Sequence, residues 1–198
     1  MKAQNNTTRA SNERSNLKVL TLVDSLRAAS VNRQIAGLAA ARAPAGIEVN
    51  LYRGLGGGLG ELPLYNEDID NAADLPASAH ALRGAVAHAD AILVVTPEYN
   101  GSIPGALKNA IDWLSRPYGH NALSAKPLAV VGASMGQYGG VWAHDEARKS
   151  FGIAGANVVD AATFSLPIDT LAGKLPRESH EVVASLNDVL TKLAAEAS

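Results

Sequence analysis

From residue 17 onward, short runs of aliphatic and β-branched residues alternate with longer stretches rich in alanine and leucine. This alternation is typical of βαβ units, in which a crossover helix joins two parallel strands. We predict strands at 17–23, 47–52, 91–95, 127–131 and 157–161. The intervening stretches predict helices at 31–43, 77–88, 105–115 and 141–153, followed by a last helix at 178–195.

The hydrophobic pattern also predicts how the elements are layered. The strands at 91–95 and 127–131 are almost continuously hydrophobic, as expected when helices cover both faces of a parallel sheet. The fold class is therefore α/β, with a doubly wound, five-stranded parallel sheet in one domain at residues 17–198. Residues 1–16 are polar almost throughout and are expected to form a disordered leader.

Composition narrows the possible chemistry. The 198 residues include 17 Lys plus Arg and 19 Asp plus Glu, which leaves a net charge of −2 and favours neither nucleic acid nor an anionic membrane as a partner. There are no cysteines, which excludes thiolate catalysis, disulfides and thiolate metal sites. Since neither a signal peptide nor an apolar run of about 20 residues is present, we expect a cytoplasmic protein.

Ligands of a doubly wound sheet bind at the carboxyl ends of its strands, so the loops there are the candidate site. The loop at 24–33 combines Ser25 and Ser30 with Arg27 and Asn32, directly before a predicted helix. Hydroxyls, a guanidinium and the backbone N–H groups of a helix N-terminus together form a phosphate cradle. The alternative is that Ser30 is an ordinary N-cap and Arg27 is solvated.

The loop at 96–105 follows the third strand. Pro97 and Pro104 stiffen it, and its glycines permit a close backbone approach to a ligand. Its backbone groups could bind the edge of a flat heteroaromatic ligand while Tyr99 covers one face. The alternative is an ordinary β-to-α turn with Pro104 near the helix start. A stripe predicted to lie in the core or a subunit interface follows: Leu107, Ala110, Ile111 and Leu114.

The loop at 132–140 contains the pattern G-x-S-x-G, which is the nucleophile elbow of α/β-hydrolases. Ser134 would then be the nucleophile, with Asp160 or Asp169 and His180 completing a triad. Against this reading, a nucleophile elbow leads straight into a helix, whereas Gly139 and Gly140 prolong the loop. The favoured alternative is that Ser134 and the N–H groups of this loop bind the polar rim of the ligand.

Three further features carry weaker signals. The glycine-rich stretch 54–60 lacks a following helix start and is interpreted as a flexible connection. The acidic residues Glu67, Asp68, Asp70 and Asp74 lack the pattern of a calcium loop and are expected to form a solvated turn. The histidines have no metal-ligand spacing, so surface or ordinary helix roles are expected for His80, His88, His120, His144 and His180.

The stretch 96–113 resembles the signature of the NAD(P)H-dependent FMN reductases, the flavodoxin-like group that includes bacterial quinone, chromate and azo-compound reductases. The loop at 25–33 is similar to the phosphate loop of that family, and 132–140 is similar to its third flavin loop. The resemblance runs from residue 17 to the end of the fifth strand. It implies a flavodoxin-like sheet in the order 2-1-3-4-5 and FMN as the cofactor.

The resemblance also implies which residues bind FMN. The phosphate would be held by Ser25, Arg27, Ser30 and Asn32. The isoalloxazine would be lined, largely through backbone groups, by Pro97, Glu98, Tyr99 and Asn100. The other edge of the site would be completed by Ser134, Met135 and Gly136. Members of the family are usually homodimers or homotetramers, so Leu64 and Tyr65 would approach the flavin of another subunit.

By the same resemblance, FMN accepts a hydride from NAD(P)H and passes electrons to a quinone, azo compound, chromate or free flavin in ping-pong turnover. The flavin carries this chemistry, so no catalytic side chain and no metal are expected. A flavodoxin-type electron carrier that oxidises no NAD(P)H is the alternative, but such carriers tend to be strongly acidic. The sequence chooses neither the acceptor nor NADH over NADPH.

One residue departs from the family pattern. Asp24 stands where the family commonly has glycine, close to the expected position of a dianionic phosphate. Like charges a few ångströms apart cost on the order of several kcal/mol at an effective dielectric constant near 20. We therefore expect Asp24 to point away from the phosphate or to pair with Arg27 or Arg33.

Overall fold

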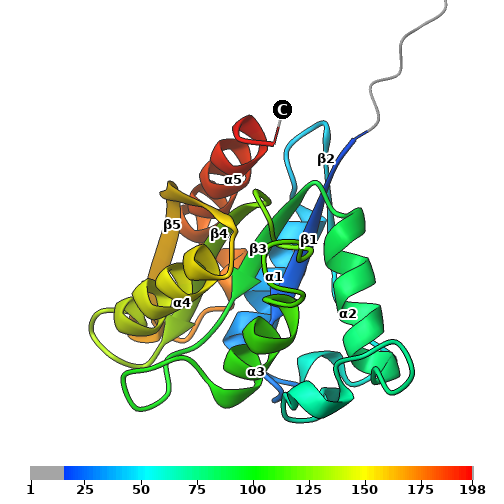
Figure 1. The fold of residues 1–198 in the computed structure, drawn as a ribbon. Helices are drawn as coiled ribbons and strands as arrows, with labels where there is room; N and C mark the ends of the chain where they lie inside the picture. The colour runs from blue at the N-terminus through cyan, green and yellow to red at the C-terminus, as the bar shows by residue number, and fades with distance from the viewer. Residues whose placement is uncertain (1–15, 198) are drawn as a thin grey trace, which may run out of the picture.

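The computed structural model describes residues 16–197, so the leader expected at residues 1–16 lies, apart from Asn16, outside the described residues. The elements alternate along the chain as the hydrophobic pattern predicts (Figure 1). The strands are β1 (Leu17–Val23), β2 (Ile47–Leu51), β3 (Ala91–Val95), β4 (Pro127–Ser134) and β5 (Asn157–Pro167). The α-helices are α1 (Val31–Ala41), α2 (Ala77–His88), α3 (Gly105–Leu114), α4 (Val141–Ile153) and α5 (His180–Ala195).

The strands form one parallel sheet in the order β2-β1-β3-β4-β5, which confirms the order implied by the family resemblance. Since all five strands run in the same direction, their carboxyl ends meet at one edge of the sheet. The loops that leave β1, β3 and β4 therefore start from three adjacent strands. This edge is where a doubly wound sheet binds its ligands.

Two hydrophobic cores lie on opposite faces of the sheet. Alternate residues of a strand point to opposite faces, so within β3 Ile92 packs with α2, α3 and α4 while Leu93 packs with α1 and α5. Figure 1 shows the same division of the helices between the two faces. Leu107 and Leu114 are fully buried, so this part of the predicted stripe on α3 belongs to the core.

Two strands are longer than predicted. β4 continues through Gly132 to Ser134, and β5 continues beyond residue 161 to Pro167. The pairing of β4 with β5 shifts between Leu128 and Val130. Leu128 is paired with Val158, so regular pairing would place Asp160 opposite Val130, but Val130 is paired with Thr163 instead. This bulge interrupts the alternation of polar and apolar residues in β5, which is why the sequence pattern ends the strand too early.

Three helix boundaries also differ from the prediction, the smallest difference being at α3, which ends one residue early at Leu114. α1 ends at Ala41, two residues early. α5 begins at His180, because the Ser179 hydroxyl accepts a hydrogen bond from the Val182 N–H and caps the helix. Glu178, the predicted first residue of this helix, belongs to a separate 3₁₀ turn, η4 (Pro176–Glu178).

The glycine-rich segment after β2 is more regular than the flexible connection that we expected. It leads into a 3₁₀ helix, η1 (Gly58–Glu61), and the Glu61 carboxylate accepts hydrogen bonds from the Leu55 and Gly57 N–H groups at 2.6 and 3.1 Å. Glu61 is the last residue of η1, and its side chain folds back to hold the glycine-rich turn that precedes this helix. A side-chain cap four to six residues away leaves little signal in local composition.

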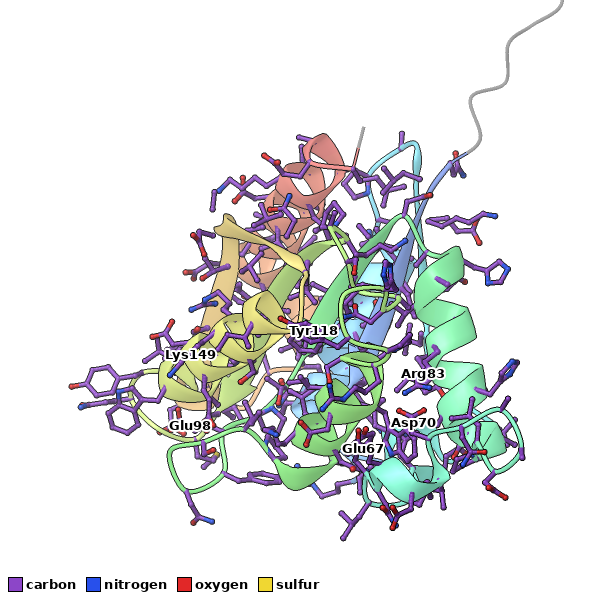
Figure 2. All side chains as sticks on the ribbon, in the orientation of Figure 1. Glu67, Asp70, Arg83, Glu98, Tyr118 and Lys149 are labelled. Carbon is purple, nitrogen blue, oxygen red and sulfur yellow. The ribbon has the colours of Figure 1, made fainter. Side chains whose placement is uncertain are left out.

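Two polar residues are less exposed than a solvated turn or a surface position would imply. Asp70 forms a bidentate ion pair with Arg83, at 2.7 and 2.8 Å, which holds the pKa of Asp70 below its usual value (Figure 2). His144 is completely buried within α4. Both positions look like surface residues in the sequence because their partners are 13 and 21 or more residues away.

Within residues 16–197, none of the helices has the length and apolar character that a bilayer crossing requires. The same part of the chain contains no cluster of three His, Asp or Glu side chains arranged to hold a metal ion.

Candidate functional site

Three loops meet at the carboxyl edge of the sheet: 24–30 after β1, 96–104 after β3, and 135–140 after β4. Side chains connect each loop to the next. Asp24 accepts a hydrogen bond from Thr96, and Asn32 at the start of α1 binds Ala133 of β4. The three segments singled out in the sequence therefore form one continuous rim.

The β1–α1 loop presents a row of hydrogen-bond donors. The backbone N–H groups of residues 25–29 have no acceptor within residues 16–197. Ser30 caps α1, since its hydroxyl accepts the Asn32 N–H at 3.1 Å, and Arg33 Nε donates to the Ser25 carbonyl at 2.8 Å. Arg27 is exposed. Free N–H groups at a helix N-terminus, with serine hydroxyls and an arginine beside them, are a site for a phosphate group.

The side chain of Asn32 is directed towards β4. Its Nδ2 donates to the Ala133 carbonyl at 2.9 Å, and its Oδ1 accepts from the Ala133 N–H at 2.8 Å. Asn32 is 3% exposed, so both bonds are shielded from water. This reciprocal pair holds the β1–α1 loop in register with the end of β4, and it gives Asn32 a positioning role that the sequence did not reveal.

Replacing Asn32 with alanine should remove both bonds and leave two buried backbone groups of Ala133 without their side-chain partner. We expect the free energy of unfolding to fall by about 2–3 kcal/mol, measured by urea denaturation. Asn187→Ala is the matched control, because the Asn187 side chain makes no hydrogen bond within the described residues, and its effect should stay within about 0.5 kcal/mol. Equal losses in the two variants would contradict this role for Asn32.

The β3–α3 loop forms a tight hairpin. Tyr99 and Ser102 exchange backbone hydrogen bonds of 3.0 and 3.1 Å across Asn100 and Gly101, which both have positive φ, at 54° and 73°. Asn-Gly is the favoured sequence for such a turn. The turn exposes the Tyr99 ring (53%) and leaves the N–H groups of 98, 100 and 101 without an acceptor in the described chain. A flat ligand can therefore meet both an aromatic face and backbone donors here.

Two carboxylates connect this hairpin to α4. Glu98, from the loop, accepts the Ala143 N–H at 3.2 Å and so caps the N-terminus of α4 (Figure 2). Glu146, from α4, accepts the Ser102 hydroxyl at 2.7 Å and the Ile103 N–H at 3.3 Å. The loop and the helix thus hold each other. Glu146 was not predicted, because its partners lie more than 40 residues away in the chain.

The β4–α4 loop is shorter than expected, because Gly132 and Ser134 belong to β4. Gly140 has φ 95° and begins the turn into α4. Met135 is 69% exposed, and the N–H groups of 135–138 have no acceptor in the described part of the chain. Beside this loop, the Tyr138 and Trp142 rings lie 5.8 Å apart, and both are more than half exposed. Neither aromatic residue was predicted to lie at the site.

A buried polar chain runs beneath the rim. His144 Nε2 lies 3.0 Å from the Thr96 carbonyl, and Nδ1 lies 2.6 Å from Ser165 Oγ. Burial lowers the pKa of His144, which favours the neutral ring. Because a carbonyl can only accept, Nε2 carries the proton, and Nδ1 accepts from the Ser165 hydroxyl. His144 therefore fastens β3 and β5 to α4.

This geometry disfavours the serine hydrolase alternative. Ser134 is the last residue of β4 and is separated from α4 by a six-residue loop, so it does not stand on a strand-to-helix elbow. His180 is exposed at the start of α5 and forms no hydrogen bond with Ser134 in the described structure. The nearby His144 has both ring nitrogens occupied. No base is arranged to activate Ser134 within residues 16–197.

Asp24 lies at the start of the β1–α1 loop and is 2% exposed. It forms no ion pair with Arg27 or Arg33 within the described chain, so the expected pairing was wrong, and its side chain turns to Thr96 instead, with Thr96 Oγ1 at 3.3 Å. Its second oxygen, Oδ1, has no partner in the described residues. Burial raises the pKa of Asp24 to about 7, although the Thr96 hydroxyl and the Leu107 N–H offset part of the rise.

The rim fits a mononucleotide whose ring system is flat. Free N–H groups that suit a phosphate lie at the β1 loop, and an exposed aromatic residue with free N–H groups lies at the β3 loop, one strand away. The third row of donors, at 135–138, lies beyond β3 at the end of β4. The fold and this site define a flavodoxin-like mononucleotide-binding protein.

Comparison with known proteins agrees with this class. The quinone reductase of Pseudomonas putida is 46% identical over 132 residues, covering 67% of this chain and 68% of that protein. The 2-hydroxy-1,4-benzoquinone reductase of Burkholderia is 42% identical over the same shares of the two chains. The solved structure of the flavoenzyme NAD(P)H:(acceptor) oxidoreductase FerB from Paracoccus denitrificans superimposes with a TM-score of 0.74 and 29% identity, covering 91% of this chain and 98% of that one.

The family described as NADPH-dependent FMN reductase matches residues 17–170. The chain belongs to this family, and it is an FMN-dependent oxidoreductase. The resemblance in the three loops is thereby confirmed at the level of the family.

Proposed function

We propose that this protein oxidises NAD(P)H through bound FMN and reduces a quinone-type acceptor in ping-pong turnover. The observation that carries the proposal is the convergence of three loops, each with unpartnered N–H donors among the described residues, at the carboxyl ends of β1, β3 and β4. The relatives named as quinone reductases support a quinone as the acceptor.

The binding roles follow from the donors that each loop presents. In the proposal, Ser25, Arg27 and Ser30 hold the phosphate together with the free N–H groups of 25–29, while Asn32 positions that loop through Ala133. Pro97 to Asn100 line the isoalloxazine, and the Glu98 carboxylate stays on α4. Ser134, Met135 and Gly136 lie at the far edge of the site.

The flavin, when bound, supplies hydride acceptance and electron release. The protein binds and orients it, and it supplies donors to the polar edge of the ring. The buried acid and base nearest the rim, Asp24 and His144, lie beneath the loops and are bonded to Thr96. Accordingly, the proposal assigns no proton transfer to a protein side chain.

Anaerobic addition of NADPH or NADH to the purified yellow protein tests the proposal directly. We expect rapid bleaching of the flavin absorbance, and return of the colour when a benzoquinone is added, because each half-reaction can be observed separately in ping-pong turnover. The measurement is stopped-flow absorbance. Flavin that stays oxidised with both coenzymes would instead indicate an electron carrier.

A colourless preparation is resolved by titration with FMN. Binding should change the flavin spectrum and raise the Tm of the protein, since a ligand that binds only the native state stabilises it. Ser134→Ala serves as a second control. Turnover of p-nitrophenyl esters that this substitution abolished would revive the hydrolase alternative.

We also propose a cytoplasmic homodimer or homotetramer. The location follows from the reductant, which is a cytoplasmic coenzyme. Association is supported by large apolar side chains that are exposed in the single chain, among them Leu64 (83%), Tyr118 (85%) and Ile153 (77%). Tyr65 is not free to reach a second flavin, because its ring packs edge-on against Trp113 of the same chain at 5.0 Å. Leu64 is therefore the better candidate for contact with a neighbouring subunit.

A further inference from the structure

A second cavity lies beside the phosphate loop, on the side of β2. Its volume is about 440 Å³, and it is lined by Leu26 and Arg33 from the β1–α1 segment and by Tyr52, Arg53, Gly57 and Leu59 from the segment after β2. None of the side chains proposed to bind FMN lines it, but Leu26 and Ala28, whose N–H groups are proposed to face the phosphate, do, so the cavity adjoins the phosphate end of the site. Because β2 is next to β1 and on the opposite side from β3 and β4, this cavity extends the line of the flavin loops beyond their phosphate end.

The cavity carries two free positive charges. Arg33 and Arg53 are exposed, and neither forms an ion pair within residues 16–197. Arg33 uses Nε on the Ser25 carbonyl, which leaves its terminal amino groups available and anchors the guanidinium at the phosphate loop. Both arginines line the same cavity.

The acidic groups around the cavity do not cancel these charges by direct pairing. The Glu61 carboxylate accepts hydrogen bonds from the Leu55 and Gly57 N–H groups. Burial, and secondly the negative charge of Glu61, raise the pKa of Tyr52 to about 12. Asp24 is buried beneath the neighbouring loop and turned to Thr96. The guanidinium groups therefore remain available to an external anion.

Apolar groups complete the wall. Leu59 is buried, and the exposed Leu26 side chain lies against Gly60, where an added Cβ would be 2.9 Å from a Leu26 methyl group. An arginine pair beside an aliphatic wall suits a ligand with a phosphate at one end and a flat apolar ring beside it. From the end of β4 to the end of β2 the sheet spans about 14 Å, at about 4.8 Å per strand, which is the scale of a dinucleotide.

We propose that this cavity binds the phosphate-bearing adenosine end of a dinucleotide, with Arg33 and Arg53 on the phosphate and the exposed Leu26 side chain against the adenine. The inference rests on the proposed function, because it assumes that a nucleotide already occupies the flavin loops. Two ligands carry this chemistry: NADPH, through its 2′-phosphate, and FAD, through its ADP half. Arg53 discriminates between ligands here without touching the flavin ring.

The first test uses the holoenzyme and Arg53→Gln. We expect inhibition by 2′,5′-ADP to weaken about tenfold and the KM for NADPH to rise by a similar factor, since the loss of one charged hydrogen bond has this effect. The KM for NADH, inhibition by 5′-AMP and the Kd for FMN should not change. Arg177→Gln is the matched control, because Arg177 is exposed on η4 and no hydrogen bond or ion pair of its side chain occurs in the described chain.

The second test distinguishes the source of the phosphate. The full-length protein is freed of flavin and titrated with FMN and with FAD. A loss of FAD affinity in Arg53→Gln, with FMN affinity and 2′,5′-ADP inhibition unchanged, supports the same site with FAD as its ligand. The proposal is overturned if neither 2′,5′-ADP inhibition nor the FAD-to-FMN affinity ratio changes, or if FMN affinity falls by the same factor. If the wild type still oxidises NADH while these outcomes occur, the dinucleotide cavity is wrong but the proposed function stands.

Discussion

Replacing Asp24 with asparagine is expected to stabilise the protein at neutral and alkaline pH. In the wild type, the buried carboxyl has a pKa of about 7, against 3.8 for a solvated aspartate. This difference of about 3 corresponds to about 4 kcal/mol of destabilisation once the group is ionised in the folded state. Asparagine has nearly the same shape and no charge to bury.

The hydrogen bonds to Asp24 offset only part of the rise in its pKa, and the contacts of the Thr96 hydroxyl are compatible with a protonated Asp24. Thr96 Oγ1 lies 3.3 Å from Asp24 Oδ2 and 3.1 Å from the Pro97 carbonyl, but the hydroxyl has only one proton. A protonated Asp24 can donate to Thr96 Oγ1, which then donates to the Pro97 carbonyl, so both contacts are satisfied. The side-chain amide introduced by Asp24→Asn would donate in the same way.

The sign of the pH dependence follows from proton binding. Between about pH 4 and pH 7 the folded state keeps the proton of Asp24 and the unfolded state has lost it, so stability falls as the pH rises. The advantage of Asp24→Asn should therefore be small near pH 4 and should approach its full value near pH 8. Urea denaturation across this range measures it. Asp160→Asn, at an exposed position on β5, is the control. If both variants changed the free energy of unfolding by a similar amount that did not depend on pH, a raised pKa of Asp24 would be refuted.

FMN affinity should change in the same direction. An ionised Asp24 under the phosphate loop repels a dianionic phosphate, and a repulsion of only about 1.4 kcal/mol weakens binding tenfold. We expect Asp24→Asn to bind FMN about tenfold more tightly near pH 8 and with little difference near pH 5, as measured by flavin fluorescence titration. Variant and wild type with equal FMN affinities at both pH values would show that the phosphate does not sense this carboxyl.

Replacing Gly132 with alanine is expected to destabilise the protein by about 3 kcal/mol or more. A Cβ at this position would lie 2.0 Å from the Thr96 carbonyl oxygen and 2.7 Å from His144 Nε2. Neither neighbour can move freely, because the Thr96 N–H is bonded to Val131 and the Thr96 carbonyl accepts from His144. Overpacking against backbone costs stability in proportion to the structure that must shift.

Gly136→Ala provides the control for this substitution. Gly136 belongs to the same G-x-S-x-G pattern, but it has no atom within 4 Å of an added Cβ and no positive φ. Its unfolding free energy should stay within about 0.5 kcal/mol of the wild type. Thermal and urea denaturation of the two variants compare them directly, and similar stabilities would contradict a requirement for close approach at Gly132.

Most of the fold could be predicted because its signals are local. Each strand is a short hydrophobic run, and each of the helices begins and ends within a few residues of its predicted position. The end of β5 was missed because a bulge places Val130 opposite Thr163, which depends on the neighbouring strand. Glu146 and Asn32 show the same limit at the site, since their partners are 43 to 101 residues distant.

The sequence alone determined the parallel α/β architecture and singled out the three loops that we propose bind the flavin, because residue type and spacing within each loop specify donors, turns and helix starts. The state of Asp24, the burial of His144 and the arginine cavity were decided only by the tertiary structure. A carboxyl acquires a pKa of about 7 through the desolvation that its neighbours impose, and two arginines 20 positions apart share a cavity only once β1 and β2 are paired.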